Sequence, residues 1–251
     1  MADSLPHDHI VPYNQSGESK KKQVAEMFDK IAFRYDFLNR FLSGGIDIYW
    51  RKRAVAELKA VKPGSVLDVA TGTGDVALLL LKYLDPEKII GIDISEGMLE
   101  HARQKVEKQK LKHKIELQAG DSEAIKFPNN TFDAVTVAFG VRNFEHLQQG
   151  LSEMLRVLKP GGKLVVLEFS KPRKKLFKSL YNLYMNIVAP QAGKWLTKNK
   201  NAYQYLTKSV KAFPDGHEFL HILKQTGYTD TYLKTLSLGI CTIYCGRKGI
   251  S

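Results

Sequence analysis

The sequence predicts an α/β fold, in which an open and mostly parallel sheet of seven strands carries helices on both faces. Two observations predict it. Short apolar segments rich in β-branched residues alternate with longer segments of helical periodicity, and a glycine-rich turn, Gly72-Thr73-Gly74, follows the first apolar segment. Such alternation is typical of a Rossmann-like sheet, and 251 residues suffice for one domain of this kind.

A helical cap precedes the sheet in the chain. We assign residues 1–22, which are polar and end in three lysines, to a flexible tail, and residues 23–251 to a single domain. Within the domain, residues 23–60 are expected to form an N-terminal helical cap, because apolar side chains recur at helical spacing from Val24 to Leu42. Aromatic residues extend around much of this helix, so we expect it to be covered on more than one side, either over a ligand pocket or simply against the domain.

The remaining elements follow in order. Strands are expected at Val66–Ala70, Ile89–Ile94, Ile115–Gly120, Phe132–Phe139, Lys163–Phe169, Thr229–Leu236 and Gly239–Arg247. Helices are expected at Val76–Leu84, Glu96–Lys108, Glu145–Leu158 and Asp215–Gln225, with Ser95 capping the second and Asp215 and Glu218 forming a capping box at the last. A helical insertion, residues 171–213, follows the fifth strand.

The last two strands are joined by only three residues, Ser237-Leu238-Gly239, which predicts an antiparallel hairpin at one edge of the sheet. Cys241 and Cys245 would then lie on one face of the final strand, roughly 13 Å apart and too far for a disulfide, so we expect them in the core. A seven-stranded sheet with a reversed final strand resembles the fold of class I S-adenosylmethionine-dependent methyltransferases.

The glycine-rich turn indicates a nucleoside cofactor, and its charges indicate which one. The run Gly72-x-Gly74-x-x-Ala77 also satisfies the dinucleotide fingerprint, but Asp68 precedes the turn and Asp75 follows it. These carboxylates would repel a diphosphate, whereas S-adenosyl-L-methionine carries an ammonium and a sulfonium and no phosphate. Asp93, at the end of the second strand, can accept hydrogen bonds from both ribose hydroxyls.

Composition limits the class of protein. A hydrophobic content of 43% and a charged content of 25% are ordinary for a globular domain. No apolar run approaches the roughly 20 residues of a membrane helix, and the polar N-terminus does not resemble a signal peptide, so we expect the cytoplasm. The histidines lack metal-ligand spacing, and no metal is expected. The oligomeric state stays open between monomer and homodimer.

Polar side chains also follow the third and fourth strands, where ligands of parallel sheets bind. Asp121 and Ser122 can accept a hydrogen bond from an adenine amine, although a strand-ending aspartate can also simply form a turn. Arg142 and Asn143 follow the strand whose end faces the transferable methyl group in this architecture. Arginine stays protonated at neutral pH, so Arg142 can stabilise a phenolate or orient a water but cannot act as a base; its structural alternative is a salt bridge.

Three segments resemble the ubiquinone/menaquinone biosynthesis C-methyltransferases. They are Tyr35-Asp36-Phe37-Leu38-Asn39 with Leu42-Ser43-Gly44-Gly45-Ile46-Asp47 and Trp50; Phe139-Gly140-Val141-Arg142-Asn143; and Arg156–Leu164 with Leu167–Pro172. The similarity covers the chain from about Val24 to the final strand. Asp47 stands where the family usually has histidine, and Ala138 stands where many members have serine. These departures put a histidine-dependent role and one cofactor contact in question.

The resemblance implies a cofactor, a reaction and site residues. Thr73, Asp93, Asp121 and Ser122 would contact S-adenosyl-L-methionine beside the loop of Asp68, Gly72 and Gly74. The reaction would transfer a methyl group to a ring carbon of a reduced prenylated quinone, which we interpret as demethylmenaquinol, with the benzoquinol of the ubiquinone pathway as the alternative. A quinol hydroxyl has a phenol-like pKa near 10, and its deprotonation makes the adjacent ring carbon a strong nucleophile. Arg142 would stabilise that phenolate, Asn143 would hold the hydroxyl or a water, and Tyr35 and Asp47 are further candidates for proton transfer.

The net charge of +12 calls for an anionic partner, and much of it lies in one segment. Residues 171–211 contain ten basic and no acidic residues, beside apolar and aromatic residues from Leu176 to Val188. We expect this segment to lie on anionic lipid at the inner face of the cytoplasmic membrane, with the prenyl tail entering between it and the N-terminal helix. A buried face with a solvated basic rim is the alternative.

Other function classes share these features. A nucleic-acid methyltransferase would use the lysines on phosphates, but no catalytic Cys-Pro or Asn-Pro-Pro-Tyr type motif follows the fourth strand, so no nucleic-acid partner is expected. A catalytically silent scaffold of a quinone-synthesis assembly would not need the glycines and strand-end acids. The same acids disfavour a dehydrogenase.

Overall fold

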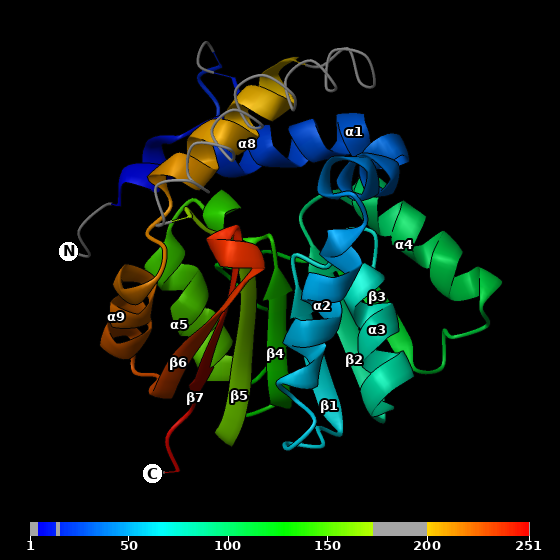
Figure 1. Ribbon diagram of the computed structural model, residues 1–251. Helices are drawn as coiled ribbons and strands as arrows, with labels where there is room; N and C mark the ends of the chain where they lie inside the picture. The colour runs from blue at the N-terminus through cyan, green and yellow to red at the C-terminus, as the bar shows by residue number, and fades with distance from the viewer. Residues whose placement is uncertain (1–4, 14–15, 173–199, 251) are drawn as a thin grey trace.

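The computed structural model describes residues 5–13, 16–172 and 200–250, arranged as Figure 1 shows. Seven strands form one sheet in the order β3-β2-β1-β4-β5-β7-β6. They are β1 (Ser65–Val69), β2 (Lys88–Asp93), β3 (Ile115–Ala119), β4 (Phe132–Ala138), β5 (Leu158–Phe169), β6 (Thr229–Leu236) and β7 (Cys241–Arg247). Only β7 runs against its neighbours, which confirms the predicted sheet with its reversed final strand.

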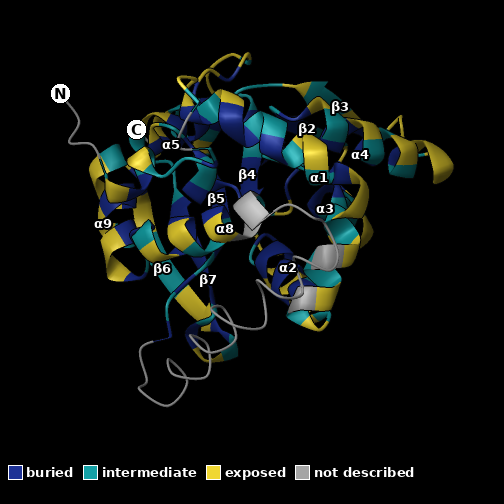
Figure 2. Ribbon diagram, turned by 90° about the horizontal axis from the view of Figure 1, so that it is seen from above, coloured by how far each residue is buried: buried dark blue, intermediate teal, exposed yellow. Residues whose placement is uncertain are grey.

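Helices cover both faces of the sheet and the end at which its parallel strands have their carboxyl termini. They are η1 (Pro6–His9), α1 (Lys20–Ser43), α2 (Ile46–Ala56), α3 (Asp75–Leu84), α4 (Glu96–Lys108), η2 (Val141–Asn143), α5 (Leu147–Val157), α8 (Lys200–Ala212), α9 (His217–Thr226) and η4 (Ser237–Gly239). Figure 1 shows α1 and α8 crossing the top of the sheet, and Figure 2 looks down on this layer. The cap therefore lies over the edge where ligands of parallel sheets bind.

Both faces of the sheet are buried, so successive side chains alternate between two cores. Leu67 and Val69 belong to the core shared with α5 and α9, whereas Val66 belongs to the core shared with α2 and α3. Cys241 and Cys245 lie in the second core as buried free thiols, as their spacing predicts. The central strands are consequently held rigidly, and with them the loops at their ends.

The N-terminal segment differs from the flexible tail expected for residues 1–22. Lys20 begins α1, because the Ser19 hydroxyl caps the helix by accepting a hydrogen bond from the Lys22 N–H. Upstream, His7 is fully buried, and its carbonyl oxygen accepts a hydrogen bond of 2.7 Å from the Lys20 Nζ. Burial, aided by the Lys20 charge, lowers the pKa of His7 to about 3. The described part of this segment is thus packed on the domain.

Two predicted boundaries are also wrong. β5 begins at Leu158 rather than Lys163, since Leu158 pairs with Phe132 before the register shifts to pair Lys163 with Ala134. α9 begins after Gly216 and not in a capping box at Asp215. The Asp215 carboxylate instead accepts a hydrogen bond of 3.0 Å from the Lys171 N–H and forms an ion pair with the Lys171 Nζ.

The expected basic and aromatic insertion at residues 171–213 is described only at its two ends. Residues 171 and 172 follow the end of β5, and α8 with the chain to residue 213 returns beside α1 over the carboxyl ends of the strands (Figure 1). Leu176–Val188, the segment expected to contact lipid, lies outside the described residues.

Candidate active site

A pocket lies beneath α1 at the carboxyl ends of the parallel strands. Its empty volume is about 640 Å³, which includes space open to the solvent. Its polar part is lined by Gly72, Asp93, Gly120, Asp121, Ser122 and Glu123, and its apolar part by Val24, Phe28, Ile94, Phe139 and Phe144, with Lys21, Tyr35, Ala70, Met98, Ala138, Gly140, Asn143 and Glu145 completing the wall. The pocket thus joins a polar half over β1, β2 and β3 to an apolar half below α1.

The backbone takes uncommon conformations where the strands open into this pocket. Ala70, Gly72 and Phe139 have φ values of 51°, 56° and 58°, in the left-handed region. Non-glycine residues rarely adopt this region, and such strain gathers at functional sites. At Gly140 an added Cβ would lie 2.7 Å from the Ala70 Cβ, so the turns after β1 and β4 meet too closely for a side chain there. Tight packing therefore sets the floor of the pocket.

Two buried carboxylates lie at the ends of β1 and β2. Asp68 accepts hydrogen bonds of 2.6 and 2.7 Å from the hydroxyls of Thr71 and Thr136. Asp93 accepts bonds of 2.8 and 2.9 Å from the Gly72 and Ser95 N–H groups. Burial raises the pKa of both aspartates to about 6, partly opposed by these hydrogen bonds. Within the described part of the chain neither carboxylate forms an ion pair, which leaves negative charge available to a cationic ligand.

Helix α1 is fastened over the pocket by polar contacts to the strand-end loops. The Lys21 Nζ lies 2.5 Å from Asp121 after β3, and Asp29 accepts hydrogen bonds of 2.6 and 2.9 Å from the Ser95 hydroxyl and the Gly97 N–H. Asp36 accepts a bond of 2.5 Å from the Thr73 hydroxyl in the glycine-rich turn. Each predicted cofactor loop therefore contacts α1, and Thr73 and Asp121 already have partners on it.

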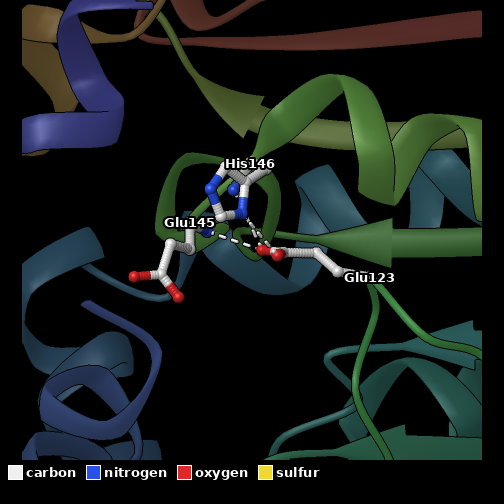
Figure 3. A group of neighbouring side chains, drawn as sticks. All are labelled: Glu123, Glu145 and His146. Carbon is white, nitrogen blue, oxygen red and sulfur yellow. Dashed lines mark hydrogen bonds and ion pairs between the residues drawn. The ribbon is translucent and has the colours of Figure 1, made fainter. Parts of the chain in front are cut away.

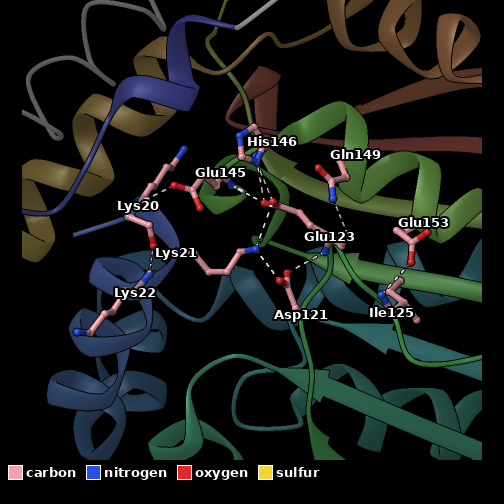
Figure 4. A network of polar contacts seen from close by, with 11 residues as sticks. Lys20, Lys21, Lys22, Asp121, Glu123, Ile125, Glu145, His146, Gln149 and Glu153 are labelled. Carbon is pink, nitrogen blue, oxygen red and sulfur yellow. Dashed lines mark hydrogen bonds and ion pairs between the residues drawn. The ribbon is translucent and has the colours of Figure 1, made fainter. Parts of the chain in front are cut away.

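Glu123 braces the loop that follows η2. Its buried carboxylate accepts bonds of 2.7 and 3.0 Å from the N–H groups of Glu145 and His146, and lies 3.0 Å from the His146 ring (Figure 3). The Lys21 Nζ lies 3.3 Å away, so the same carboxylate ties this loop to α1 (Figure 4). Although Glu123, Glu145 and His146 lie within reach of one ion, the Glu123 oxygens already accept these hydrogen bonds. Their arrangement is that of a structural brace for the wall at Asn143 and Glu145.

Arg142 lies behind the pocket wall rather than in it. Its guanidinium is buried, pairs with Glu168 of β5 at 2.9 Å and donates a 2.5 Å bond to the Phe139 carbonyl oxygen. The neighbouring Asn143 does line the pocket, and its amide donates to the same carbonyl at 3.3 Å. The salt bridge considered as the structural alternative for Arg142 is therefore present, and the charge reaches the pocket only through its neighbours.

Asp47 also lies outside the pocket wall. It is buried, pairs with Arg51 one turn later and accepts a bond of 2.8 Å from the Ser43 hydroxyl. Arg51 in turn lies 5.3 Å from the centre of the Phe139 ring, and the Trp50 ring packs 6.3 Å from it. The N-terminal signature and the segment after β4 thus meet as one aromatic and ionic cluster, in which Asp47 holds Arg51.

The structure brings Tyr35, Gly72, Asp93, Asp121, Ser122 and Asn143 together around the pocket. Asp68 and Gly74 support the floor: Asp68 is buried under the turn, and an added Cβ on Gly74 would lie 3.2 Å from that of Ala102. Sequence reasoning missed Lys21, Glu123 and Tyr205. Tyr205 of α8 is buried against Val24. In the part of the chain that the structure describes, its hydroxyl has no hydrogen-bond partner, like Arg142 Nε and Asn143 Oδ1.

The sheet order, the cap and a pocket at the carboxyl ends define the class: this is the fold of class I methyltransferases. An S-adenosylmethionine-dependent methyltransferase of Thermotoga maritima shares it with a TM-score of 0.61 at 18% identity, over 89% of this chain and 99% of that one. A likeness at this identity concerns the fold alone.

Residues 16–248 match the model of the ubiE/COQ5 methyltransferase family, and the chain belongs to that family. Its methyl donor is S-adenosyl-L-methionine. Similar relatives include the demethylmenaquinone methyltransferase of Bacteroides fragilis, 47% identical over 98% of this chain and 100% of that protein. The ubiquinone/menaquinone biosynthesis C-methyltransferase UbiE of Geobacter sulfurreducens is 48% identical over 92% of this chain and 90% of that protein. The family predicted from the sequence motifs is confirmed.

Glu168→Gln tests whether the buried pair holds this region together. The change leaves the Arg142 guanidinium buried without a counter-charge, so we expect the free energy of unfolding to fall by about 3–5 kcal/mol. Urea denaturation at neutral pH measures it. Glu96→Gln, which removes one partner of an exposed ion pair with Arg103, is the matched control and should cost less than about 1 kcal/mol. Equal losses in the two variants would contradict the assignment.

Proposed function

We propose that the protein transfers a methyl group from S-adenosyl-L-methionine to a ring carbon of demethylmenaquinol, forming menaquinol. The Bacteroides fragilis relative bears the name of this activity and matches the chain from end to end. One structural observation supports it most: Asp93, which is buried and has no ion-pair partner among the described residues, lines a pocket whose other half is apolar, and Asp68 lies buried beneath the same turn. Such a pocket suits a cationic donor beside a neutral aromatic ring.

The polar half of the pocket fits the donor. Asp93 has both oxygens anchored by backbone N–H groups, so its remaining lone pairs are directed for two ribose hydroxyls. Gly72 leaves space where a side chain would stand, since an added Cβ would meet nothing within 4 Å. Asp121 and Ser122 lie on the next loop, where we assign the adenine amine. Asp68 contributes negative charge from below the turn.

The apolar half suits the quinol ring. Val24, Phe28 and Phe144 offer apolar surface, while Asn143 and Tyr35 offer polar groups at its border. Asn143 Oδ1 is buried and has no hydrogen-bond partner among the described residues, as a group reserved for a ligand hydroxyl would be. We assign Asn143 to the hydroxyl beside the reacting carbon and Tyr35 to a proton-transfer contact.

S-adenosyl-L-methionine, when bound, supplies an electrophilic methyl group. The chain must then lower the cost of forming the phenolate and hold the ring in position, which together can supply several kcal/mol. The hydroxyl loses its proton, and the adjacent ring carbon forms the new bond to the methyl group as the bond from that group to the donor sulfur breaks. Loss of the proton on that carbon then restores the aromatic ring as a phenolate, which takes up a proton to give the quinol. S-adenosylhomocysteine is the other product.

Arg142 is a positioning residue in this scheme. Its guanidinium and the Asn143 amide share the Phe139 carbonyl oxygen, so the ion pair with Glu168 fixes where Asn143 points. Asp47 has its partner in Arg51, and we assign it no proton-transfer step.

We also propose that the protein works at the inner surface of the cytoplasmic membrane, because a prenylated quinol is a lipid. None of the described helices combines the length and apolarity needed to cross a bilayer. Peripheral contact would bring the site to a lipid substrate without a membrane-spanning helix. The basic segment at residues 171–211 remains a candidate for this contact, on its composition alone.

Short-chain quinols test the substrate directly. We expect purified protein with S-adenosyl-L-methionine to convert demethylmenaquinol to a product heavier by one CH₂, and to act more slowly on the demethylated benzoquinol of the ubiquinone pathway. Mass spectrometry of both reactions under reducing conditions measures this preference. Faster turnover of the benzoquinol would assign the alternative substrate, and turnover of neither would overturn the proposal.

Removing both charges of the buried pair tests Arg142 without leaving a lone charge inside the protein. For the Arg142→Gln/Glu168→Gln double variant we expect turnover to fall by at least ~10²-fold, while the dissociation constant of S-adenosyl-L-methionine changes less than about threefold. Steady-state kinetics and calorimetry measure the two quantities. Near-normal turnover in a folded double variant would remove Arg142 from the mechanism.

Binding of the cationic donor should depend on pH through Asp93. Burial raises the pKa of Asp93 to about 6, so the carboxyl is mostly protonated at pH 5. Because the folded state favours the protonated carboxyl, the stability that this proton contributes to the folded protein is lost as pH rises through 6. Ionisation favours a cation, so affinity should rise roughly tenfold per pH unit up to about pH 6 and then level off. Calorimetry from pH 5 to 7.5 measures this, and Asp93→Asn should give weak binding with a flatter profile. A flat profile in the unchanged protein would contradict the assignment.

A further inference from the structure

Helix α1 presents two different apolar faces. Val24, Phe28 and Tyr35 point into the pocket. Phe33 and Phe37, about half a turn away on a helix of 3.6 residues per turn, are 79% and 57% exposed. The sequence-based expectation that this helix is covered on more than one side therefore fails for its outer face in the described structure.

Exposed apolar side chains continue along the chain into α2. We define the aromatic face as Phe33, Phe37, Phe41, Ile46 and Tyr49, whose exposed fractions are 79%, 57%, 58%, 45% and 50%. These are five of the eight large hydrophobic side chains that are exposed among the described residues, and they fall within 17 consecutive positions. Single exposed apolar residues need no explanation, but a contiguous group marks a surface that binds something.

Cations surround this face. The Arg34 guanidinium lies 5.9 Å from the Phe33 ring centre, and Lys52 and Arg53, both exposed, follow Tyr49 by three and four residues on the same side of α2. The neighbouring α3 adds Lys82, 5.8 Å from the centre of the exposed Tyr83 ring. From residue 30 to residue 62 the chain has eight basic and three acidic residues, 8 − 3 = +5.

The three acids in this segment do not offset the charge at the surface. Asp36 pairs with Lys105 of α4 at 2.5 Å, and Asp47 is buried against Arg51. Glu57 pairs with Lys234 of β6 at 2.8 Å. Each carboxylate is therefore held by the domain, and the outer face shows apolar rings bordered by cations.

We propose that the aromatic face docks on the surface of an anionic lipid bilayer. Apolar rings among cations are the features of an interfacial helix, whose rings enter the acyl boundary while the cations meet the headgroups. A bilayer needs no matching shape, and it favours the positive charge that a basic protein partner would repel. The proposal rests on the proposed function only in its consequence: the inner face of the same helix lines the pocket, so docking would bring the site to the layer that holds a prenylated quinol.

Cosedimentation of the full chain with vesicles tests the surface. We expect binding to phosphatidylcholine vesicles that contain phosphatidylglycerol and little binding to phosphatidylcholine alone. Phe33→Ser/Phe37→Ser/Phe41→Ser should weaken binding roughly tenfold or more, since three apolar side chains leave the contact. Leu238→Ser/Ile250→Ser, which removes exposed apolar side chains elsewhere, is the matched control and should bind normally. Unchanged thermal melting verifies that the variants are folded.

Lys52→Gln/Arg53→Gln should weaken binding only to the anionic vesicles. Normal vesicle binding by the triple phenylalanine variant would overturn the proposal, as would a wild-type chain that binds no vesicle. Light scattering that shows a dimer lost in the triple variant, without vesicle binding, would assign the face to a second copy instead and equally overturn it.

A second readout separates this surface from the chemistry. The triple variant should keep its turnover on a water-soluble short-chain quinol and lose it on a long-chain quinol embedded in vesicles. If no quinol is methylated by any form of the protein, the proposed function fails, while the sedimentation result still decides the docking surface.

Discussion

The structure depends on the burial of two carboxylates beneath a tight turn. Asp68 and Asp93 end adjacent parallel strands, and burial makes their ionisation unfavourable. Hydroxyls of two threonines and N–H groups of the turn and of the following helix offset part of this cost. The remaining cost of ionisation would be reduced by a bound cation. The left-handed backbone at Ala70 and Gly72 leaves space beside the carboxylates for such a ligand. The glycine turn therefore stabilises a buried carboxylate, through the Gly72 N–H, as well as leaving space for the ligand.

The helical cap is held over these loops by ion pairs. Lys21 is drawn to Asp121 and Glu123, and Lys105 joins Asp36 of α1 to Asp75 at the start of α3. Together with the hydrogen bonds of Asp29 to Ser95 and Gly97, these contacts hold α1 over the loops that follow β1, β2 and β3. Behind them, the Arg142–Glu168 pair and the aromatic cluster of Trp50, Phe139 and Phe169 stiffen the wall after β4. The site is thus assembled by side chains far apart in the chain, although each of its loops is locally simple.

Much of the fold could be predicted because its periodicity is local. The apolar side chains of β1, β2 and β4 are divided between two cores, and the glycine turn and Asp93 lie where a doubly wound sheet requires them. The N-terminal boundary could not be predicted, since Lys20, Lys21 and Lys22 resemble a solvated run until their partners at His7, Asp121 and Glu18 are known. Arg142 shows the same limit: its position after β4 is readable, but its pairing with Glu168, 26 residues away, is not. Tyr205 gave no signal, because a tyrosine in an amphipathic helix is ordinary.

The ion pairs that hold α1 over the pocket are weak. The Lys21–Asp121 and Arg40–Asp75 pairs are partly exposed, with side-chain accessibilities of 31% and 30% in the first pair and 42% and 19% in the second. Ion pairs of this kind contribute little individually, and ions in the solvent screen them. Opening of α1 would break these weak pairs while the strands and their two cores stay intact.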